Sequence, residues 1–312
     1  MGTIIEVENL TKRYKGASTN AVDAVSFAVG SGSFFALLGP NGAGKTTTIS
    51  MLTTTLAPTS GTARVAGHDL VREAAAVRRD VGIIFQKPSL DQNLTGEENV
   101  RLHTLLYGLY PWRPIYRLMP STYRVALHEM AQLLGIGDDI FKPVRTYSGG
   151  MKRKLEIVRA LLHRPKVLFL DEPTAGLDVP TRRTLWDHLT KVRRESSTTI
   201  FLTTHYIEEA ETADSICIID RGKIVSFGTP DEVKARLVQH YVDVDAADRA
   251  ALLRELRRIG VQFTEGRRVR VELDGMSTHA LLKSIDVPLT YVQTHMPSLE
   301  DAYLEIVAGA EK

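Results

Sequence analysis

Short apolar runs separated by turn residues occupy the first part of the chain. The runs at residues 4–10, 25–29 and 34–38 are rich in Val, Ile and Phe and are bounded by Gly and Ser, which predicts β-strands. The longer stretch at 44–56 predicts the first helix, and the apolar run at 81–86 predicts another buried strand. These elements predict a sheet built around one early helix.

The hydrophobic period changes between residues 95 and 163. Apolar residues recur there at helical spacing, as in ENVRLHTLLYGL and RVALHEMAQLLGI, which predicts a helical subdomain inserted between strands. Buried strands return at 166–173 and 198–205, on either side of a charged helix at 181–195. Strands that alternate with helices favour a mostly parallel sheet covered by helices, so the fold class is α/β.

A hairpin and a capped helix end this first region. The run at 215–228 predicts two strands with Arg221 and Gly222 at the turn. Thr229 and Glu232 then form the pattern of a capping box. The first domain is therefore predicted to span residues 1–238.

Residues 239–312 predict a second, smaller domain. Its strands and helices follow the order βαββαβ with a final helix, which is the split βαβ or ferredoxin-like α+β pattern. We expect an accessory or regulatory domain, and the sequence does not distinguish these roles.

Composition and charge limit the classes of function that the chain can have. The chain has 39 Lys and Arg against 37 Asp and Glu, so no strong basic footprint for nucleic acid is present. Its single cysteine, Cys217, excludes an internal disulfide and lies in an apolar run typical of core. Neither a signal peptide nor an apolar run long enough to cross a bilayer is visible. The protein is expected to be soluble or peripheral, so a membrane role needs a partner.

The stretch GPNGAGKT at residues 39–46 matches the phosphate-binding pattern G-x-x-x-x-G-K-[ST]. It follows a predicted strand and opens a predicted helix, which is the context that this motif needs. The glycines let backbone N–H groups turn toward phosphates, and the helix N-terminus adds partial positive charge. Lys45 is expected to reach the β- and γ-phosphates, and the Thr46 hydroxyl to bind Mg²⁺.

The apolar strand VLFLDEP supplies the acids of the predicted site. Asp171 at its end is placed to bind Mg²⁺, and Glu172 to face a water beside the γ-phosphate. The alternative is a solvated acidic turn. Two adjacent acids at the end of a buried strand are costly unless a cation lies there, which favours the metal site.

A second glycine pair, in YSGGMKRK at 147–154, has no role in a single phosphate loop. With it, the sequence resembles the ATP-binding subunits of ABC transporters in an ordered match from about residue 4 to 228. The motifs that carry the resemblance are Tyr14 in TKRYKG, GPNGAGKTT as Walker A, Gln86 as the Q-loop, YSGGM as the signature, VLFLDEPTAGLD as Walker B with the D-loop, and His205 in TTHYIEEA.

This resemblance implies a P-loop NTPase of the ABC cassette type, with ATP and Mg²⁺ as ligands. Glu172, His205 and Gln86 would be catalytic, and Thr46, Gln86 and Asp171 would hold the metal. The implied ATP-binding residues are Tyr14, which would stack on adenine, and Gly39, Pro40, Asn41, Gly42, Ala43, Gly44, Lys45, Thr46, Thr47, Ser148, Gly149, Gly150 and Asp178. Of these, Ser148 and Gly150 would reach the ATP of a second copy in a head-to-tail dimer.

The resemblance also implies an ATP-hydrolysing transport subunit. Its partners would be a second copy or a related ATPase subunit and a separate transmembrane permease, at the cytoplasmic face of the membrane, with no nucleic acid. Met151 stands where many family members have Gln, and drug-export-type subunits commonly have Met there, as this chain does. The C-terminal segment MPSLEDAYLEIVAG is also similar to that of drug-export subunits, those like the daunorubicin-resistance ATPase. Export of a drug, lipid or polysaccharide is therefore expected, although the sequence does not name the cargo.

Two other functions stay open at this stage. One is the ATPase of an importer. The other is a soluble ABC-type ATPase that acts on DNA or ribosomes, but such proteins usually carry two cassettes or a long coiled coil. This chain has one cassette and near-neutral charge.

Three further segments are exposed in our interpretation. Residues 110–124 combine Trp112 with tyrosines, prolines and arginines, and form either a docking surface for a membrane partner or a self-packed surface loop. The basic runs at 152–154 and 267–270 are interpreted as solvated faces.

Overall fold

Two compact units divide the chain in the computed structural model. The first is Met1–Phe227 and the second is Gly228–Lys312. This division places the helix after residue 229 in the second unit, whereas the sequence analysis set the boundary after that helix, near residue 238. The structure describes residues 2–85, 89–175, 179–237, 241–273, 275–295, 298–301 and 303.

The first unit alternates strands and helices as the hydrophobic pattern predicted. In chain order its elements are β1 (Thr3–Lys12), β2 (Val22–Gly30), β3 (Phe34–Leu38), α1 (Lys45–Leu52), β4 (Ser60–Val65), β5 (His68–Asp69), α2 (Ala74–Asp80), β6 (Val81–Ile84), α3 (Gly96–Leu106), η1 (Tyr116–Leu118), α4 (Ser121–Leu133), η2 (Gly137–Asp139), η3 (Val144–Thr146), α5 (Gly149–Leu161), β7 (Val167–Asp171), α6 (Val179–Ser196), β8 (Thr199–Thr204), α7 (Ile207–Ala210), β9 (Ser215–Asp220) and β10 (Lys223–Gly228).

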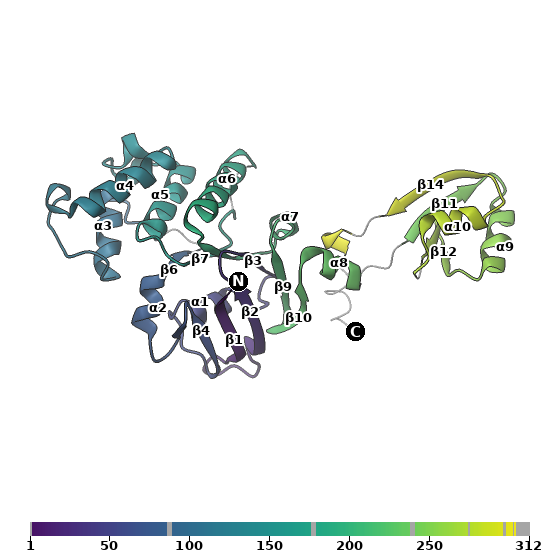
Figure 1. Ribbon diagram of the computed structural model, residues 1–312, viewed down its shortest axis with the longest axis horizontal. Helices are drawn as coiled ribbons and strands as arrows, with labels where there is room; N and C mark the ends of the chain where they lie inside the picture. The colour runs from purple at the N-terminus through teal and green to yellow at the C-terminus, as the bar shows by residue number, and fades with distance from the viewer. Residues whose placement is uncertain are drawn as a thin grey trace. The chain divides into compact units, whose positions relative to one another are not determined.

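A six-stranded sheet with the order β10-β9-β3-β8-β7-β6 forms the centre of the first unit (Figure 1). The pairs β3–β8, β3–β9, β7–β8 and β6–β7 are parallel. In this register Leu38 pairs with Thr204 and Asp171 pairs with Thr203. The carboxyl ends of β3, β7 and β8 therefore meet at one edge of the sheet, where parallel α/β sheets bind ligands.

In a second sheet, β2-β1-β4-β5, the pairs β1–β2, β1–β4 and β4–β5 are antiparallel. Helix α1 shares one buried cluster with both sheets, since Ile49 and Leu52 belong to the same core as Val7 of β1 and Phe169 of β7. Cys217 of β9 lies in this core and is fully buried, which confirms its prediction as a core residue. Burial raises the pKa of its thiol, so the residue stays uncharged.

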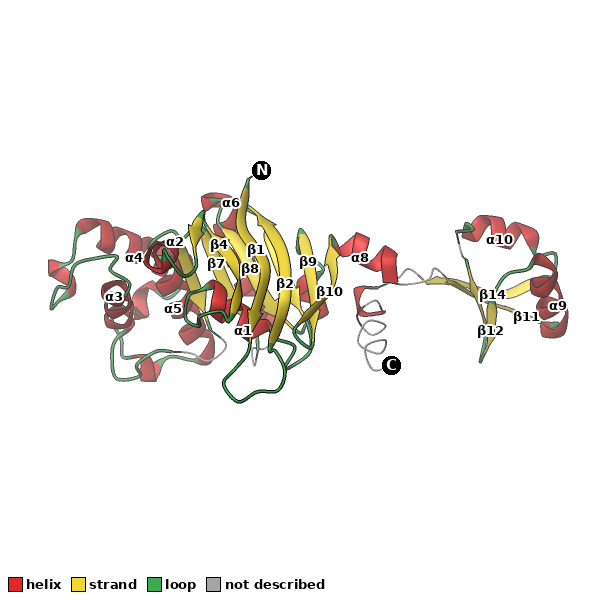
Figure 2. Cartoon of the chain, turned by 90° about the horizontal axis from the view of Figure 1, so that it is seen from below, coloured by secondary structure: helices red, strands yellow, loops and turns green. Residues whose placement is uncertain are grey.

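The predicted helical subdomain contains α3, α4 and α5, which pack against one another and, through α5, against β6. Figure 1 shows the three helices gathered near β6, and Figure 2 shows them together at one end of the first unit. A capping box that the sequence analysis did not note begins α3, where Thr95 accepts from the backbone of Glu98 and the Glu98 carboxylate accepts from the backbone of Thr95.

The basic run at 152–154 does not form a fully solvated face, because Arg153 is buried with 7% exposure. Helical periodicity is the physical reason, since Arg153 lies on the face of α5 that is turned toward the sheet. The run at 267–270 fits its prediction at Arg267, Arg268 and Arg270, which are exposed, while Val269 points into the core.

The second unit has the predicted βαββαβ order. Its sheet runs β12-β13-β11-β14, and Val242, Val244 and Val271 pack with Leu252 and other apolar side chains in a core of its own. The predicted capping box also forms, because Glu232 donates its backbone N–H to the Thr229 hydroxyl at 3.2 Å. The elements are α8 (Pro230–Leu237), β11 (Tyr241–Ala246), α9 (Arg249–Ile259), β12 (Phe263–Glu265), β13 (Val269–Glu272), α10 (Thr278–Ser284) and β14 (Leu289–His295).

In the portions of the chain that the structure describes, no helix is both long and apolar enough to cross a bilayer.

Candidate functional site

The loop between β3 and α1 is shaped to surround phosphate groups. Gly44 precedes α1 with φ 107°, and a Cβ there would lie 2.5 Å from the Ala21 carbonyl oxygen. Only glycine fits both demands. No side chain caps the N-terminus of α1, so its first backbone N–H groups stay available to an anion.

Lys45 is buried at the base of this loop with 4% exposure. Its ammonium donates to the carbonyl oxygens of Gly39 at 2.7 Å and Pro40 at 3.1 Å. The same nitrogen lies 3.4 Å from Glu172 Oε1. A buried cation is therefore held between the loop and the end of β7, beside the place where phosphates would bind.

Asp171 ends β7 next to Thr46. The Thr46 hydroxyl donates to Asp171 Oδ1 at 3.2 Å, and the Thr203 hydroxyl donates to the same oxygen at 2.6 Å. Burial raises the pKa of Asp171, and the hydrogen bonds from Thr203 and Thr46 oppose that shift. Such a carboxylate is costly to ionise alone and gains from a nearby cation.

Glu172 follows with a strained backbone. Its φ is 45°, in the left-handed region that a non-glycine residue rarely adopts. Its N–H donates to the Thr203 carbonyl oxygen at 3.0 Å, and its Oε1 lies 3.3 Å from His205 Nδ1. Strain of this kind persists where the surroundings fix a side chain for function.

The Tyr206 ring packs against the His205 ring. The two rings have centroids 4.0 Å apart, and the Arg182 guanidinium lies 4.7 Å from the centre of the Tyr206 ring. Because Arg182 belongs to α6, this stack connects the histidine to the helix that follows Walker B.

One cavity of about 460 Å³ brings most of these groups together. Its lining residues are Ala21, Asn41, Gly42, Gly44, Lys45, Thr46, Thr47, Glu172, Ala175 and His205. Tyr14 lies beside it, since its hydroxyl is 3.3 Å from the Thr47 hydroxyl while the side chain is 48% exposed. An exposed ring next to the cavity is available for stacking on a planar base.

The signature residues lie elsewhere in the same chain. Ser148 accepts from the Met151 N–H at 3.2 Å and caps α5. Ser148 and Gly149 are exposed, and a Cβ on Gly149 would meet no atom within 4 Å. Among the described residues that line the phosphate-loop cavity, none comes from 148–150.

Two predicted site residues, Gln86 and Asp178, lie outside the described residues. Ala21, Thr203 and Ala175 touch the site but were not predicted from sequence. Ala21 and Ala175 carry no chemistry that a motif search would find. Thr203 could have been found from its place opposite Asp171 on the neighbouring strand.

Similarity to known proteins shows the family to which these site residues belong. A family model described as ABC transporter matches residues 22–175. The daunorubicin resistance ATP-binding protein DrrA3 of Streptomyces coeruleorubidus is 36% identical over 314 residues, which cover 97% of this chain and 96% of that protein. The chain belongs to the ABC transporter family. The sequence-based recognition is thus confirmed, and the chain is an ATP hydrolase of the ABC type.

Two further ABC proteins are similar to shorter parts of the chain. The daunorubicin/doxorubicin resistance ATP-binding protein DrrA of Streptomyces peucetius is 42% identical over 234 residues, which cover 75% of this chain and 67% of that protein. A solved structure described as a dimeric post-hydrolysis state of an ATP-binding cassette bound to ADP and Pi has a TM-score of 0.63 and 27% identity, and the match covers 72% of this chain and 98% of that chain. The predicted fold class, an ABC cassette with a small additional α+β part, is confirmed.

The oxygen atoms near Lys45 fit a magnesium ion held together with a nucleotide. No group of three or more His, Cys, Asp or Glu side chains able to hold a metal occurs within the described ranges. Mg²⁺ is commonly bound by one or two protein oxygens, phosphate oxygens and water, so a large acidic cluster is not needed. The adjacent oxygens of Thr46 and Asp171 fit that mode.

Segment 110–124 is partly packed and partly exposed. Arg101 donates to the carbonyl oxygens of Arg113 and Pro114, and Tyr116 packs edge-on against Tyr123. Trp112 is 60% exposed. The first observation agrees with a self-packed loop and the second with a docking surface, so both interpretations of this segment stay predictions.

Proposed function

We propose that this chain is the ATP-hydrolysing subunit of an export-type ABC transporter, acting as a head-to-tail dimer with a separate membrane subunit. The observation that carries the catalytic part is the grouping of Lys45, Asp171, Glu172 and His205 at one sheet edge. The resistance proteins to which the chain is similar support export, because their names assign them to daunorubicin or doxorubicin resistance.

The catalytic assignment follows from the contacts. Lys45 would bind the β- and γ-phosphates, and the N–H groups at the start of α1 would bind the remaining phosphate oxygens. Glu172 would orient and polarise the attacking water, and His205 would contact the γ-phosphate. Thr46 and Asp171, with Gln86 as predicted from sequence, would hold Mg²⁺, which would neutralise phosphate charge.

The dimer proposal rests on where the signature lies. Ser148 and Gly149 are exposed at the start of α5 rather than in the cavity that holds Lys45. An exposed helix N-terminus that lies outside the cavity of its own chain suits the ATP of a partner. The cassette structure described above as dimeric agrees with this arrangement.

A mixing experiment tests the shared site. Lys45→Ala disables the phosphate loop and Ser148→Arg blocks the signature, so each variant alone should be nearly inactive. In a mixed dimer one site contains both defects and the other contains neither. Mixing equal amounts should then restore about a quarter of the wild-type rate, since about half of the dimers are mixed and each has one intact site.

The result is read as steady-state ATPase activity against mixing ratio. Lack of recovery, with mixed dimers shown by a tag pull-down, would contradict the shared site. Full activity of Ser148→Arg alone would contradict it as well.

The transport part of the proposal has its own test. The chain should co-purify from membranes with an integral membrane subunit, and the pair should move daunorubicin into inverted vesicles only with hydrolysable ATP. Uptake of a solute in the opposite direction would support the importer alternative instead. Co-purification with ribosomes or DNA and no membrane protein would support the soluble alternative.

A further inference from the structure

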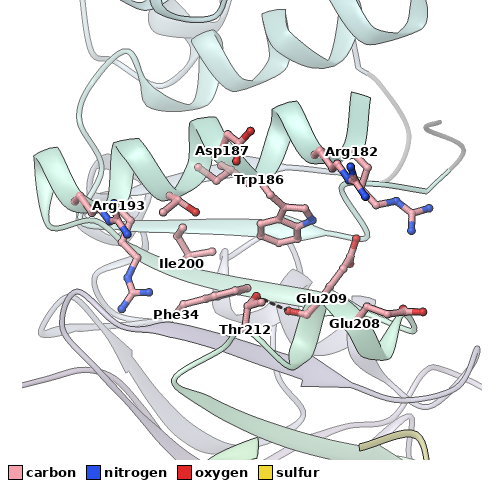
Figure 3. Close-up of a pocket in the computed structure, with 13 residues that line it drawn as sticks. Phe34, Arg182, Trp186, Asp187, Arg193, Ile200, Glu208, Glu209 and Thr212 are labelled. Carbon is pink, nitrogen blue, oxygen red and sulfur yellow. Dashed lines mark hydrogen bonds between the residues drawn. The ribbon is translucent and has the colours of Figure 1, made fainter. Parts of the chain in front are cut away.

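A buried carboxylate outside the phosphate-loop cavity connects two catalytic segments. Glu209 of α7 is only 5% exposed. Figure 3 shows it on α7, across from the helix α6 that carries Arg182 and Trp186. A buried carboxylate is costly unless its oxygens are hydrogen-bonded, so its partners indicate what it does.

Both oxygens of Glu209 accept from fully buried threonine hydroxyls. Thr174 donates to Oε1, and Thr204 donates to Oε2 at 2.7 Å. The Thr204 oxygen also accepts from the Tyr206 N–H at 2.9 Å. One side chain thereby joins the segment after β7 to the end of β8.

These two segments carry the proposed catalytic pair. Thr174 lies two positions after Glu172, and Thr204 directly precedes His205. Glu172 holds a left-handed φ of 45°, which the chain keeps only if its surroundings over-determine it. Glu209 is thus bonded to one threonine close in sequence to Glu172 and to another next to His205.

We propose that Glu209 is a positioning residue for ATP hydrolysis. By fixing Thr174 and Thr204 to one carboxylate, it sets the distance between Glu172 and His205, 3.3 Å between Oε1 and Nδ1. This inference rests on the proposed roles of those two residues. Geometry at the reacting centre is sensitive, because a shift of about 1 Å can lower a rate about 100-fold.

Threonine-to-valine exchange tests the proposal with the least change of shape. Thr174→Val and Thr204→Val each remove one hydroxyl and keep the branched side chain. Each should lower kcat about tenfold and leave the KM for ATP within about twofold, since the phosphate-binding groups are untouched. Thr174→Ser keeps the donor and should restore most of kcat.

A matched control separates positioning from general stability. Thr198 is 1% exposed and its hydroxyl donates to the Pro165 carbonyl oxygen at 3.0 Å, just before β8 and away from the cavity. Thr198→Val should lower the melting temperature about as much as Thr174→Val does, with kcat within about twofold of wild type.

Coupling gives a second measurement. If one carboxylate joins both hydroxyls, Glu209→Ala should lower kcat about as much as the double variant Thr174→Val/Thr204→Val, and less than the product of three independent losses. The proposal is overturned if Thr174→Val behaves like Thr198→Val, if KM rather than kcat changes, or if Thr174→Ser fails to rescue.

Glu172→Gln, measured in parallel, keeps the two proposals distinct. Wild-type turnover in that variant would refute the role of Glu172 itself. Loss of turnover in Glu172→Gln, together with normal kcat in Thr174→Val and Thr204→Val, would refute only the positioning role of Glu209.

Discussion

Two clusters of buried charge lie in the first unit, and they are built differently. The nucleotide cluster consists of the buried Lys45, Asp171 and Glu172 with the partly exposed His205, at the edge of the parallel sheet. The α5 cluster consists of Arg153, Glu156 and Arg159 on the helix that follows the signature. Both contain buried carboxylates, so burial alone does not distinguish them.

The contacts of the α5 cluster come from protein groups, although Arg153 Nη2 and Arg159 Nε are buried with no hydrogen-bond partner among the described residues. Glu156 is fully buried, lies 2.8 Å from Arg153 Nη1 and accepts from the Ser89 N–H at 3.2 Å. Arg153 donates to the carbonyl oxygens of Phe85 and Pro173, and Arg159 donates to Ser89. Its cations tie α5 to two other segments, which is a structural use of charge.

The nucleotide cluster instead faces a cavity. Glu172 has a left-handed backbone, burial raises the pKa of Asp171, and Lys45 is flanked by open N–H groups of α1. These features favour a polyanion with its cation rather than a closed network. A cavity, backbone strain and available donors together therefore indicate a reaction site, whereas buried charge alone does not.

The largest expected effect concerns Glu172. Glu172→Gln should lower kcat about 10³-fold, or about 4 kcal/mol, because the amide cannot polarise water as a carboxylate does. ATP binding should persist, and the closed dimer should accumulate. Single-turnover hydrolysis and size-exclusion chromatography with ATP measure both effects. A wild-type rate would remove Glu172 from the chemistry and weaken the contrast between the clusters.

The next effect belongs to the α5 cluster. Glu156→Ala leaves two buried guanidinium groups without their carboxylate and should cost about 3 kcal/mol of unfolding free energy. Glu129→Ala is the matched control, since Glu129 is 55% exposed in its pair with Arg164 and should cost under about 1 kcal/mol. Urea unfolding measures both. Equal losses would show that the α5 cluster contributes no more than a surface pair.

The two clusters also differ in how far sequence could predict them. Lys45, Asp171 and Glu172 follow from motifs whose spacing is fixed by the chemistry of phosphate binding. Arg153 belonged to a basic run that was expected to be solvated, and only the helix phase and tertiary packing bury it. Glu209 lies in TTHYIEEA, the stretch that carries His205, but no role was predicted for it, because its bond to Thr174, 35 residues earlier, depends on tertiary packing.

In the fold, too, features set by local sequence were predicted and features set by tertiary packing were not. Strand runs, the Thr229 capping box and the βαββαβ order were predicted because each depends on local pattern. The strand order β10-β9-β3-β8-β7-β6 was not, because pairing of strands distant in sequence depends on tertiary packing. The membership of Ala21 in the site depends on that packing as well.

A smaller effect on the pH dependence of stability tests whether water is excluded near the α5 cluster. Burial lowers the pKa of His103 on α3 to about 3, with the charges of Arg159 and His163 acting in the same direction. The folded protein thus binds fewer protons at this site than the unfolded chain between about pH 3 and 6.5, so stability falls as pH drops below 6.5.

From pH 7.5 to 5, this histidine should account for about 1–2 kcal/mol of lost unfolding free energy. His103→Gln cannot titrate and should lose that much less over the same range, measured by urea unfolding at both pH values. If both proteins lose stability equally, solvent reaches His103 and the closed character of this region is refuted.

The smallest effect concerns the exposed border of the nucleotide cluster. Tyr14 is 48% exposed, and its hydroxyl lies 3.3 Å from that of Thr47. If its ring stacks on adenine, Tyr14→Ala should raise the KM for ATP about fivefold, or about 1 kcal/mol, with kcat and melting temperature nearly unchanged. Tyr14→Phe keeps the ring and loses the hydroxyl, so it should bind ATP like wild type. A loss in the Phe variant equal to that in the Ala variant would assign the effect to the hydroxyl pair with Thr47. The aromatic contact would then be excluded, and nucleotide affinity would depend on the buried members of the cluster, because the phosphates rather than the base would provide the recognition.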